Sequence, residues 1–281
     1  MIITVDHSTA YRYDCAINLE PHTFRLRPRV TTTQRLLSFD LEVLPAPTGA
    51  TECLDQDDNL ALHAWFGSPV AELRVTSRFR VELLRGNPFD FNLSAESEHL
   101  PMRYPYPLSA ALSPYSNALN VHESVKRLAK AIAADGEQNV PAFLAAVNQQ
   151  IFSSFGHVTR PEGSAWPSNQ TLSALGGSCR DLAVLFCDVC RVMGIASRFV
   201  SGYECASAGH PDAEMHAWAE AYLPSAGWRG YDPSRGLLVA DGHVAVAAAF
   251  HPDLASPITG TFRGACGSRM ETRLDMQVES V

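Results

Sequence analysis

Cys179 stands where a glycine-rich turn leads into a predicted helix, in a segment (residues 175–183) that reads LGGSCRDLA. Apolar residues at helical spacing predict that this helix runs from about residue 179 to residue 193. The unpaired N–H groups and the dipole at the start of a helix stabilise a thiolate and lower its pKa. The same N–H groups can stabilise an oxyanion that forms beside the sulfur. The pattern predicts a nucleophilic thiol; a buried, inert cysteine that opens a helix is the alternative.

A thiolate nucleophile needs a general base, and the base needs a group that orients it. His216 opens a predicted strand, which a short turn joins to a second strand that ends at Asp232. If Tyr222 pairs with Trp228 across this hairpin, His216 lies diagonally beside Asp232, about 7–8 Å away between backbones. We therefore predict Cys179 as nucleophile, His216 as base and Asp232 as orienting group. A structural histidine and an Asp-Pro turn element are the alternatives for the last two.

Other motifs compete weakly with this site. Cys187 and Cys190 form a CxxC pattern in mid-helix with no second ligand pair, which favours core packing over zinc or redox chemistry. A polar cluster leads into the strand that His216 opens, and its spacing and Pro211 favour a loop over a metal site. The cluster comprises His210, Asp212, Glu214 and His216. Two tryptophans are expected either to line a groove at the site or to pack in the core, namely Trp218 and Trp228. No G-x-S-x-G elbow and no P-loop occurs.

The elements around the site predict an α+β fold. Residues 1–100 contain short β-prone runs, one of which alternates apolar and polar residues from Leu73 to Leu83, as a β-sandwich strand does. Four prolines between residues 101 and 117 indicate a linker that is neither helix nor central strand. Helical periodicity follows, and then strands return from residue 196. We expect a β-sandwich domain (1–105), a linker (106–119) and a core of helices on an antiparallel sheet with C-terminal strands (120–281).

Composition excludes several classes of function. The chain has 281 residues, 46% hydrophobic and 19% charged, with 22 basic and 30 acidic residues and a net charge of −8. No Lys/Arg cluster occurs, so nucleic acid is not an expected partner, and no apolar run is long enough to suggest a membrane span. Charged and polar residues stand where a signal peptide needs an apolar run, and the seven cysteines are an odd number. Reduced thiols and a cytoplasmic location are the expectation.

Four segments resemble the bacterial transglutaminase-like superfamily, whose members are often described as candidate cysteine proteases. They are GGSCRDLA, the helix end RVMGIASRFVSGY, MHAWAEAYLPSAGW and GYDPS, and they place Cys, His and Asp in the family's order. The N-terminal part is also similar to the β-domain that precedes the core in this family, through residues 11–13, residues 26–29 and the Asp-rich turn before Asn59. Residues 257–264 resemble the family's usual ending.

The resemblance implies a papain-like, transglutaminase-like core and thiol chemistry on an amide bond. Cys179 would attack the carbonyl, His216 would exchange the proton, and Asp232 would orient the imidazolium. The expected activity is cleavage of a peptide or isopeptide bond in a protein or peptide substrate, with no cofactor and no metal. Transglutaminase-type transfer from a glutaminyl group to an amine is the alternative, as is a non-catalytic binding module of the same fold. The substrate, the second oxyanion donor and the oligomeric state stay open.

Overall fold

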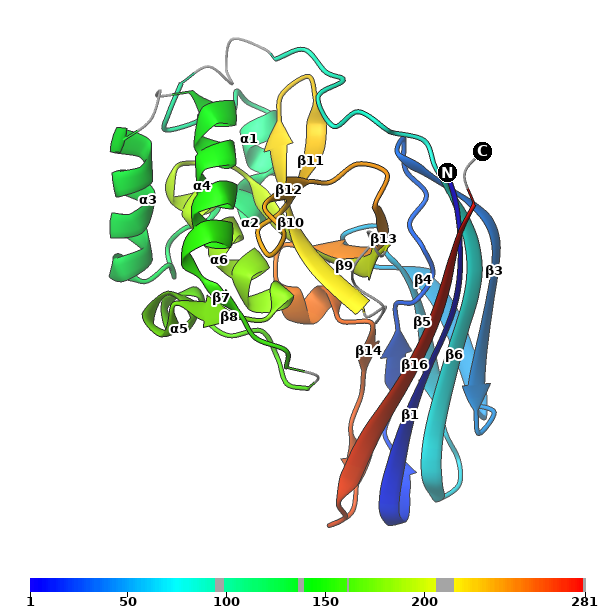
Figure 1. The fold of residues 1–281 in the computed structure, drawn as a ribbon. Coiled ribbons are helices and arrows are strands. Elements are labelled where there is room, and N and C mark those ends of the chain that lie inside the picture. The colour runs from blue at the N-terminus through cyan, green and yellow to red at the C-terminus, as the bar shows by residue number, and fades with distance from the viewer. Residues whose placement is uncertain (94–98, 136–138, 161, 206–214, 280–281) are drawn as a thin grey trace.

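The computed structural model describes residues 1–93, 99–135, 139–160, 162–205 and 215–279. It is a mixed α and β structure, as expected, with long strands in one half and helices packed on a sheet in the other (Figure 1). The strands are β1 (Ile2–Leu19), β2 (His22–Phe24), β3 (Gln34–Leu44), β4 (Gly49–Leu54), β5 (Leu60–Trp65), β6 (Val70–Leu83), β7 (Gly156–His157), β8 (Gly176–Gly177), β9 (Ser197–Glu204), β10 (Met215–Leu223), β11 (Gly227–Asp232), β12 (Leu237–Leu238), β13 (His243–Ala249), β14 (Ile258–Thr259), β15 (Phe262–Arg263) and β16 (Ser268–Glu279).

The three longest of the described helices lie where the sequence shows helical periodicity. They are α1 (Leu108–Ala111), α2 (Ser113–Ser116), α3 (Glu123–Asp135), α4 (Val140–Ser154), α5 (Ser168–Ala174), α6 (Cys179–Val192) and the short 3-10 helix η2 (Pro252–Ala255). Among the helices of the described residues, none combines the length and the apolar character that a membrane span requires. The short α1 and α2 lie inside the predicted linker, so that prediction of no helix is wrong. Pro107 precedes the first turn of α1 and Pro114 lies in the first turn of α2, positions where proline removes no helical hydrogen bond.

Two antiparallel sheets form the N-terminal β-sandwich. One contains β15, β1, β6 and β3 in that order with β16 also paired to β1, and the other has the order β14, β2, β5 and β4. In β6 the predicted alternation is confirmed: Leu73, Phe79 and Val81 are buried, whereas Arg78 and Arg80 are exposed. The buried face of one end of this sheet packs on Tyr203 of β9 and on β13, so the sandwich adjoins the core sheet.

The end of the chain returns to the N-terminal half. Along its whole length β16 pairs with β1, from Ser268 opposite Tyr13 to Glu279 opposite Ile2 (Figure 1). The short strands β14 and β15 pair with β2 and β1. The expected core range of 120–281 is therefore wrong for these C-terminal strands. Each of these pairings spans more than 230 residues, and local sequence patterns carry no information on such partners.

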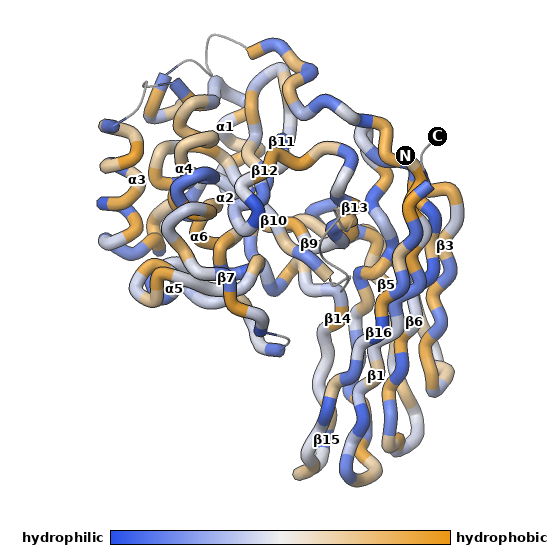
Figure 2. The backbone as a smooth tube through the Cα atoms, in the orientation of Figure 1, coloured by the Kyte–Doolittle hydropathy of each residue, from blue (hydrophilic) through white to orange (hydrophobic). Residues whose placement is uncertain are grey.

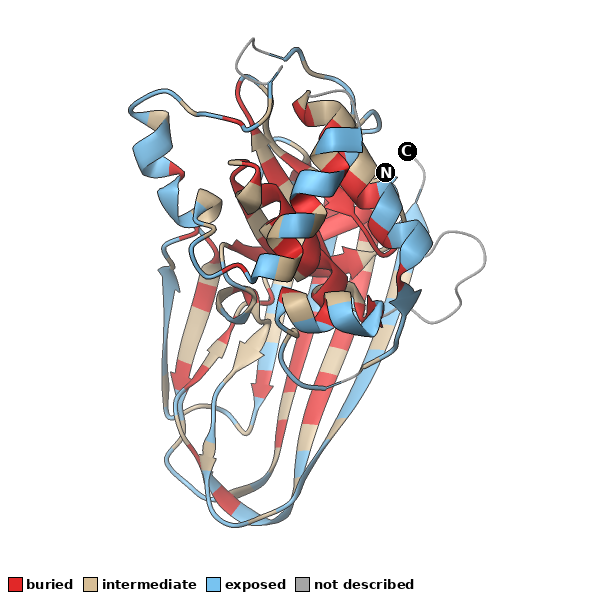
Figure 3. Cartoon of the chain, turned by 90° about the vertical axis from the view of Figure 1, so that its left-hand side faces the viewer, coloured by how far each residue is buried: buried red, intermediate tan, exposed pale blue. Residues whose placement is uncertain are grey.

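The core consists of helices α3 to α6 on an antiparallel sheet with the order β12, β11, β10, β9 and β13. Helix α6 contacts β10 and β9 and lies at the centre of the largest apolar cluster, which includes Leu185, Phe186 and Val189. Buried residues gather where the helices cover this sheet (Figure 3), and apolar segments of the tube lie there too (Figure 2). The nucleophile candidate and the base candidate thus lie on two elements that pack directly on each other.

Two side-chain amides from the N-terminal half bind the free edge of β13. The amide of Gln34 donates to Ala245 O at 2.8 Å and accepts from Ala245 N at 2.9 Å. The amide of Asn59 donates to Ala248 O at 2.9 Å and accepts from Ala248 N at 2.9 Å. Both side chains are buried, so each replaces the backbone of a missing neighbouring strand.

Candidate active site

The start of helix α6 positions Cys179. Ser178 is the N-cap residue, and Asp181 in the first turn accepts hydrogen bonds from Ser178 N at 2.8 Å and Ser178 Oγ at 2.7 Å. The same carboxylate accepts from Trp166 N at 2.7 Å and from Arg160 Nη2 at 2.7 Å. Burial raises the pKa of Asp181, but these hydrogen bonds outweigh it and hold the pKa below its ordinary value. The turn before Cys179 is therefore fixed by an ionised, fully buried carboxylate.

The two glycines before this helix allow a close approach of two backbones. A Cβ atom on Gly177 would lie 2.7 Å from the Cβ of Asp181, and one on Gly176 would lie 2.7 Å from Gly156 O. These residues form β8, which pairs in parallel with β7 and sets His157 opposite Gly177. The close approach brings His157 next to the start of α6, a consequence that the sequence pattern did not indicate.

His216 and Asp232 meet across the predicted hairpin. Strands β10 and β11 pair with Tyr222 opposite Trp228, which confirms the predicted register. His216 Nε2 donates to Asp232 Oδ2 at 2.7 Å. The His216 residue is 8% exposed and Asp232 is fully buried, so their mutual attraction is weakly screened by solvent.

The surroundings of Cys179 favour its thiolate form. Burial raises the pKa of Cys179. Interactions with the side chains of His157 and His216 and with Ala217 N lower it by more, so the pKa falls from 9.0 to about 6. Burial lowers the pKa of His216, but Asp232 and Cys179 raise it to about 10. Because His216 Nε2 faces Asp232, Nδ1 is the ring nitrogen left for the sulfur. Between these two pKa values the pair exists as thiolate and imidazolium.

Asp232 accepts more hydrogen bonds than the sequence indicated. Its Oδ2 atom also accepts from His243 Nε2 at 3.0 Å, and its Oδ1 atom accepts from Ser234 N at 3.0 Å and Ser234 Oγ at 2.7 Å. Burial raises the pKa of Asp232, but the interactions with His216 and His243 lower it well below its ordinary value. The Asp-Pro-Ser sequence at residues 232–234 is the signal for the Ser234 contact, since Asp side chains often accept from the backbone two residues on.

A second carboxylate approaches the other side of the His216 ring. Glu204 Oε2 lies 3.8 Å from His216 Nδ1. Arg235 Nε contacts the two carboxylate oxygens of Glu204 at 3.0 and 2.9 Å, and Arg235 Nη2 contacts Oε2 at 2.9 Å. The guanidinium therefore neutralises Glu204 and weakens its competition with the sulfur for the Nδ1 proton.

One group of possible metal ligands occurs in the part of the chain that the structure describes. His216, Asp232 and His243 each offer one ligand atom, and these atoms lie within 4.8 Å of one another. Direct hydrogen bonds from both histidines to Asp232 already account for this closeness. Three members of the polar cluster expected to form a loop lie outside the described residues, namely His210, Asp212 and Glu214.

The remaining predictions concern the interior. Cys187 and Cys190 are buried in the apolar core, which confirms core packing for the CxxC pattern. Trp218 is 1% exposed and packs in the core against His243, so it does not line a groove. Trp228 is partly buried and stacks on the guanidinium of Arg198, 4.2 Å from ring centroid to carbon.

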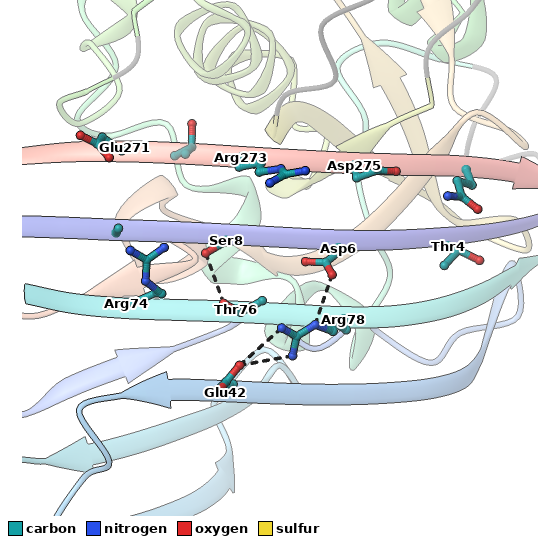
Figure 4. Close-up of a pocket in the computed structure, with 13 residues that line it drawn as sticks. Thr4, Asp6, Ser8, Glu42, Arg74, Thr76, Arg78, Glu271, Arg273 and Asp275 are labelled. Carbon is teal, nitrogen blue, oxygen red and sulfur yellow. Dashed lines mark hydrogen bonds and ion pairs between the residues drawn. The ribbon is translucent and has the colours of Figure 1, made fainter.

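A separate hollow of about 840 Å³ lies on the N-terminal sheet (Figure 4), and Cys179, His216 and Asp232 are not among its lining residues. Alternate residues of neighbouring strands line it, on the face opposite the buried Ile3 and Val5. Its central cation, Arg78, contacts Asp6 at 3.2 Å and Glu42 at 3.4 Å. Such cross-strand charge pairs are typical of a solvated sheet face, so we assign this hollow no chemistry.

Comparisons with known proteins agree with this geometry. Residues 3–82 match the bacterial transglutaminase-like N-terminal region, and residues 126–233 match the transglutaminase-like superfamily core. The core match contains Cys179, His216 and Asp232. A crystal structure of a candidate cysteine protease from Cytophaga hutchinsonii superposes with a TM-score of 0.74 and 19% identity, covering 100% of this chain and 92% of that chain. At this identity the likeness shows the fold.

Two mycobacterial relatives align with this chain over most of their length. An uncharacterised protein of Mycobacterium leprae is 27% identical over 280 residues, which cover 98% of this chain and 96% of that protein. One of Mycobacterium tuberculosis is 24% identical over 256 residues, which cover 86% of this chain and 81% of that protein. The two matched regions, the fold and the order of the site residues lead to one assignment: the chain belongs to the transglutaminase-like superfamily and carries that superfamily's bacterial N-terminal region ahead of its core.

Proposed function

We propose that this protein cleaves an amide bond, peptide or isopeptide, in a protein or peptide substrate through an acyl-thioester on Cys179. One observation carries the proposal: His216 donates to a buried, ionised Asp232, and interactions with His157 and His216 lower the pKa of the Cys179 thiol to about 6 against its burial. A thiolate–imidazolium pair held by a carboxylate is the arrangement that nucleophilic thiol catalysis requires. Membership of the transglutaminase-like superfamily supports chemistry on an acyl group.

In the first half of the reaction, the Cys179 thiolate attacks the amide carbonyl carbon. The carbonyl oxygen becomes an oxyanion, and the N–H groups at the start of α6 can donate hydrogen bonds to it. His216 then donates its Nδ1 proton to the leaving amine, the C–N bond breaks, and an acyl-thioester remains on the sulfur. Asp232 stays ionised throughout, because both its oxygens already accept hydrogen bonds.

In the second half, neutral His216 accepts a proton from the acceptor that attacks the thioester. With water the products are a carboxylic acid and free Cys179, which is hydrolysis. With a primary amine the product is a new amide, which is the transglutaminase-type alternative; the superfamily match of the core favours this as the second candidate. Both outcomes use the same acyl-enzyme and differ only in the acceptor.

A single assay separates these outcomes. The protein is incubated with an unfolded, glutamine-containing protein and a fluorescent primary amine, and the products are resolved by gel and mass spectrometry. Hydrolysis predicts unlabelled fragments or deamidated glutamines, whereas transfer predicts covalently labelled substrate. Cys179→Ala should abolish either reaction, and Cys53→Ala, which removes an exposed thiol on β4, should leave it unchanged. Activity that survives in Cys179→Ala would overturn the proposal.

A further inference from the structure

We propose that His243 is a positioning residue for the reaction at Cys179: it holds the Asp232 carboxylate, and through Asp232 it fixes the orientation of the His216 ring. This inference rests on the proposed function. His243 stands at the start of β13, 64 residues beyond Cys179, and no motif in the sequence connects the two.

The contacts of His243 are specific and buried. Its Nε2 atom lies 3.0 Å from Asp232 Oδ2, the same oxygen that His216 Nε2 contacts at 2.7 Å. The His243 residue is 6% exposed, and its ring lies edge-on to Trp218 with 5.1 Å between ring centroids. Ring orientation is therefore set by packing on one side and by a hydrogen bond on the other.

The hydrogen bonds also assign the proton on His243. Asp232 is ionised and accepts, so Nε2 must carry a hydrogen and donate it. The other ring nitrogen, Nδ1, is buried and has no hydrogen-bond partner among the residues that the structure describes. His243 thus supplies Asp232 with a second ring N–H donor, beside the one from His216.

This donor completes the coordination of the carboxylate. Oδ1 accepts twice from Ser234, and Oδ2 accepts once from each histidine, which uses the four acceptor positions of a carboxylate. Without His243, one acceptor position of Oδ2 would be buried and empty. The carboxylate could then rotate, and the His216 ring that it holds would lose its fixed distance to the sulfur.

Three charged groups lie near His243 and a fourth, Arg235, is paired with one of them, so a test that varies pH must consider all four. Asp232 lies on β11, His216 lies on β10, and Glu204 lies directly opposite His243 in the pairing of β13 with β9. Arg235 pairs with Glu204. None of these groups is altered when His243 alone is replaced.

The experiment compares His243→Phe with His243→Gln. Phenylalanine keeps a ring beside Trp218 and removes the donor, whereas glutamine keeps an N–H donor on a side chain of similar reach. For each variant we would measure kcat and KM of the proposed reaction, the rate of Cys179 modification by a dipyridyl disulfide against pH, and thermal unfolding. His251→Gln, which replaces an exposed histidine beyond the end of β13, is the matched control.

We expect His243→Phe to lower kcat by about tenfold or more with little change in KM, as for the loss of one hydrogen bond to a charged group. We also expect its Cys179 profile to move to higher pH. His243→Gln should recover most of both readouts. If His243→Phe does not fold, His243→Asn replaces it, because that shorter amide does not reach Asp232 and predicts the same loss.

Two results would overturn the inference. One is a folded His243→Phe, or His243→Asn in its place, whose kcat and Cys179 profile equal those of the wild type. The other is His243→Gln impaired as strongly as the variant without the donor. Failure of the proposed function looks different: the wild-type protein itself would then show no Cys179 reactivity at low pH and no activity that depends on Cys179.

Discussion

Replacement of His216 by glutamine tests whether this imidazolium lowers the pKa of the Cys179 thiol. In the wild type that pKa is about 6, against an ordinary 9.0. Glutamine keeps the approximate size of the side chain and cannot become a cation. Burial, which acts against the thiolate, remains after the substitution, and the hydrogen bonds from His157 and Ala217 N, which favour the thiolate, also remain. Because these remaining effects oppose each other, we expect the pKa of the variant's thiol to return to about 9.

The size of the effect depends on two opposing terms. At pH 6 about half of the wild-type thiol is ionised and about one part in a thousand of the variant thiol, a difference of about 500-fold. A thiolate of higher pKa is the better nucleophile, however, by about 20-fold over this range. The variant should then react about 25-fold more slowly at pH 6 and about tenfold faster at pH 9. The two rate profiles should cross at about pH 7.7.

The assay is modification by a dipyridyl disulfide, with peptide mapping to follow Cys179 separately from the other thiols. Exposed Cys53 in the same sample gives the reference profile, and His251→Gln is the control for loss of a remote histidine. Wild-type and variant profiles that stay parallel at every pH would refute the reasoning. A wild-type Cys179 whose rate profile follows that of Cys53 would also refute it, because His216 would then have no effect on the pKa of the Cys179 thiol.

Three further substitutions test the supports of the site. Asp181→Asn places an NH₂ group against the N–H donors that face the carboxylate, and it leaves Arg160 without its charge partner. The free energy of unfolding in urea should therefore fall by about 3 kcal/mol. A loss below about 1 kcal/mol would contradict the role assigned to Asp181. Gln34→Leu leaves the N–H of Ala245 without its acceptor and should cost about 1–3 kcal/mol in the same measurement, with exposed Thr32→Ala as a neutral control. Leu175 is 60% exposed and has a left-handed backbone at φ 46°, so Leu175→Asn should raise the melting temperature by relieving about 1 kcal/mol of strain; a lower melting temperature would show that its side-chain contacts matter more.

The parts of the site that depend on local structure could be predicted from the sequence. The contact between His216 and Asp232 followed from one hairpin, because a short turn sets the register and the period of two sets the face. The helix start at Cys179 followed from the apolar spacing after Gly177. In both cases the residues that decide the geometry lie within about 20 positions of one another, where sequence patterns are informative.

The parts that depend on the order of strands in a sheet could not be predicted. His243 meets Asp232 only because β9 lies between β10 and β13, and nothing in the spacing of residues gives that order. His157 reaches Cys179 through the two-residue strands β7 and β8, which are too short to leave an alternating pattern. The return of β16 to β1 was missed for the same reason, since its partner lies at the other end of the chain.

The N-terminal half acts on the site through the register of β13. In a regular strand, Ala245 and Ala248 would point their backbone N–H and C=O groups to opposite edges, because an odd number of positions, three, lies from one to the other. A bulge between Ala245 and Ala247 corrects this, so that both present their N–H and C=O groups to the free edge. Gln34 binds the first of these alanines and Asn59 binds the second, so the two amides fit β13 only with the bulge in that place. A strand shifted by one residue would turn His243 away from Asp232, and the sandwich domain prevents that shift.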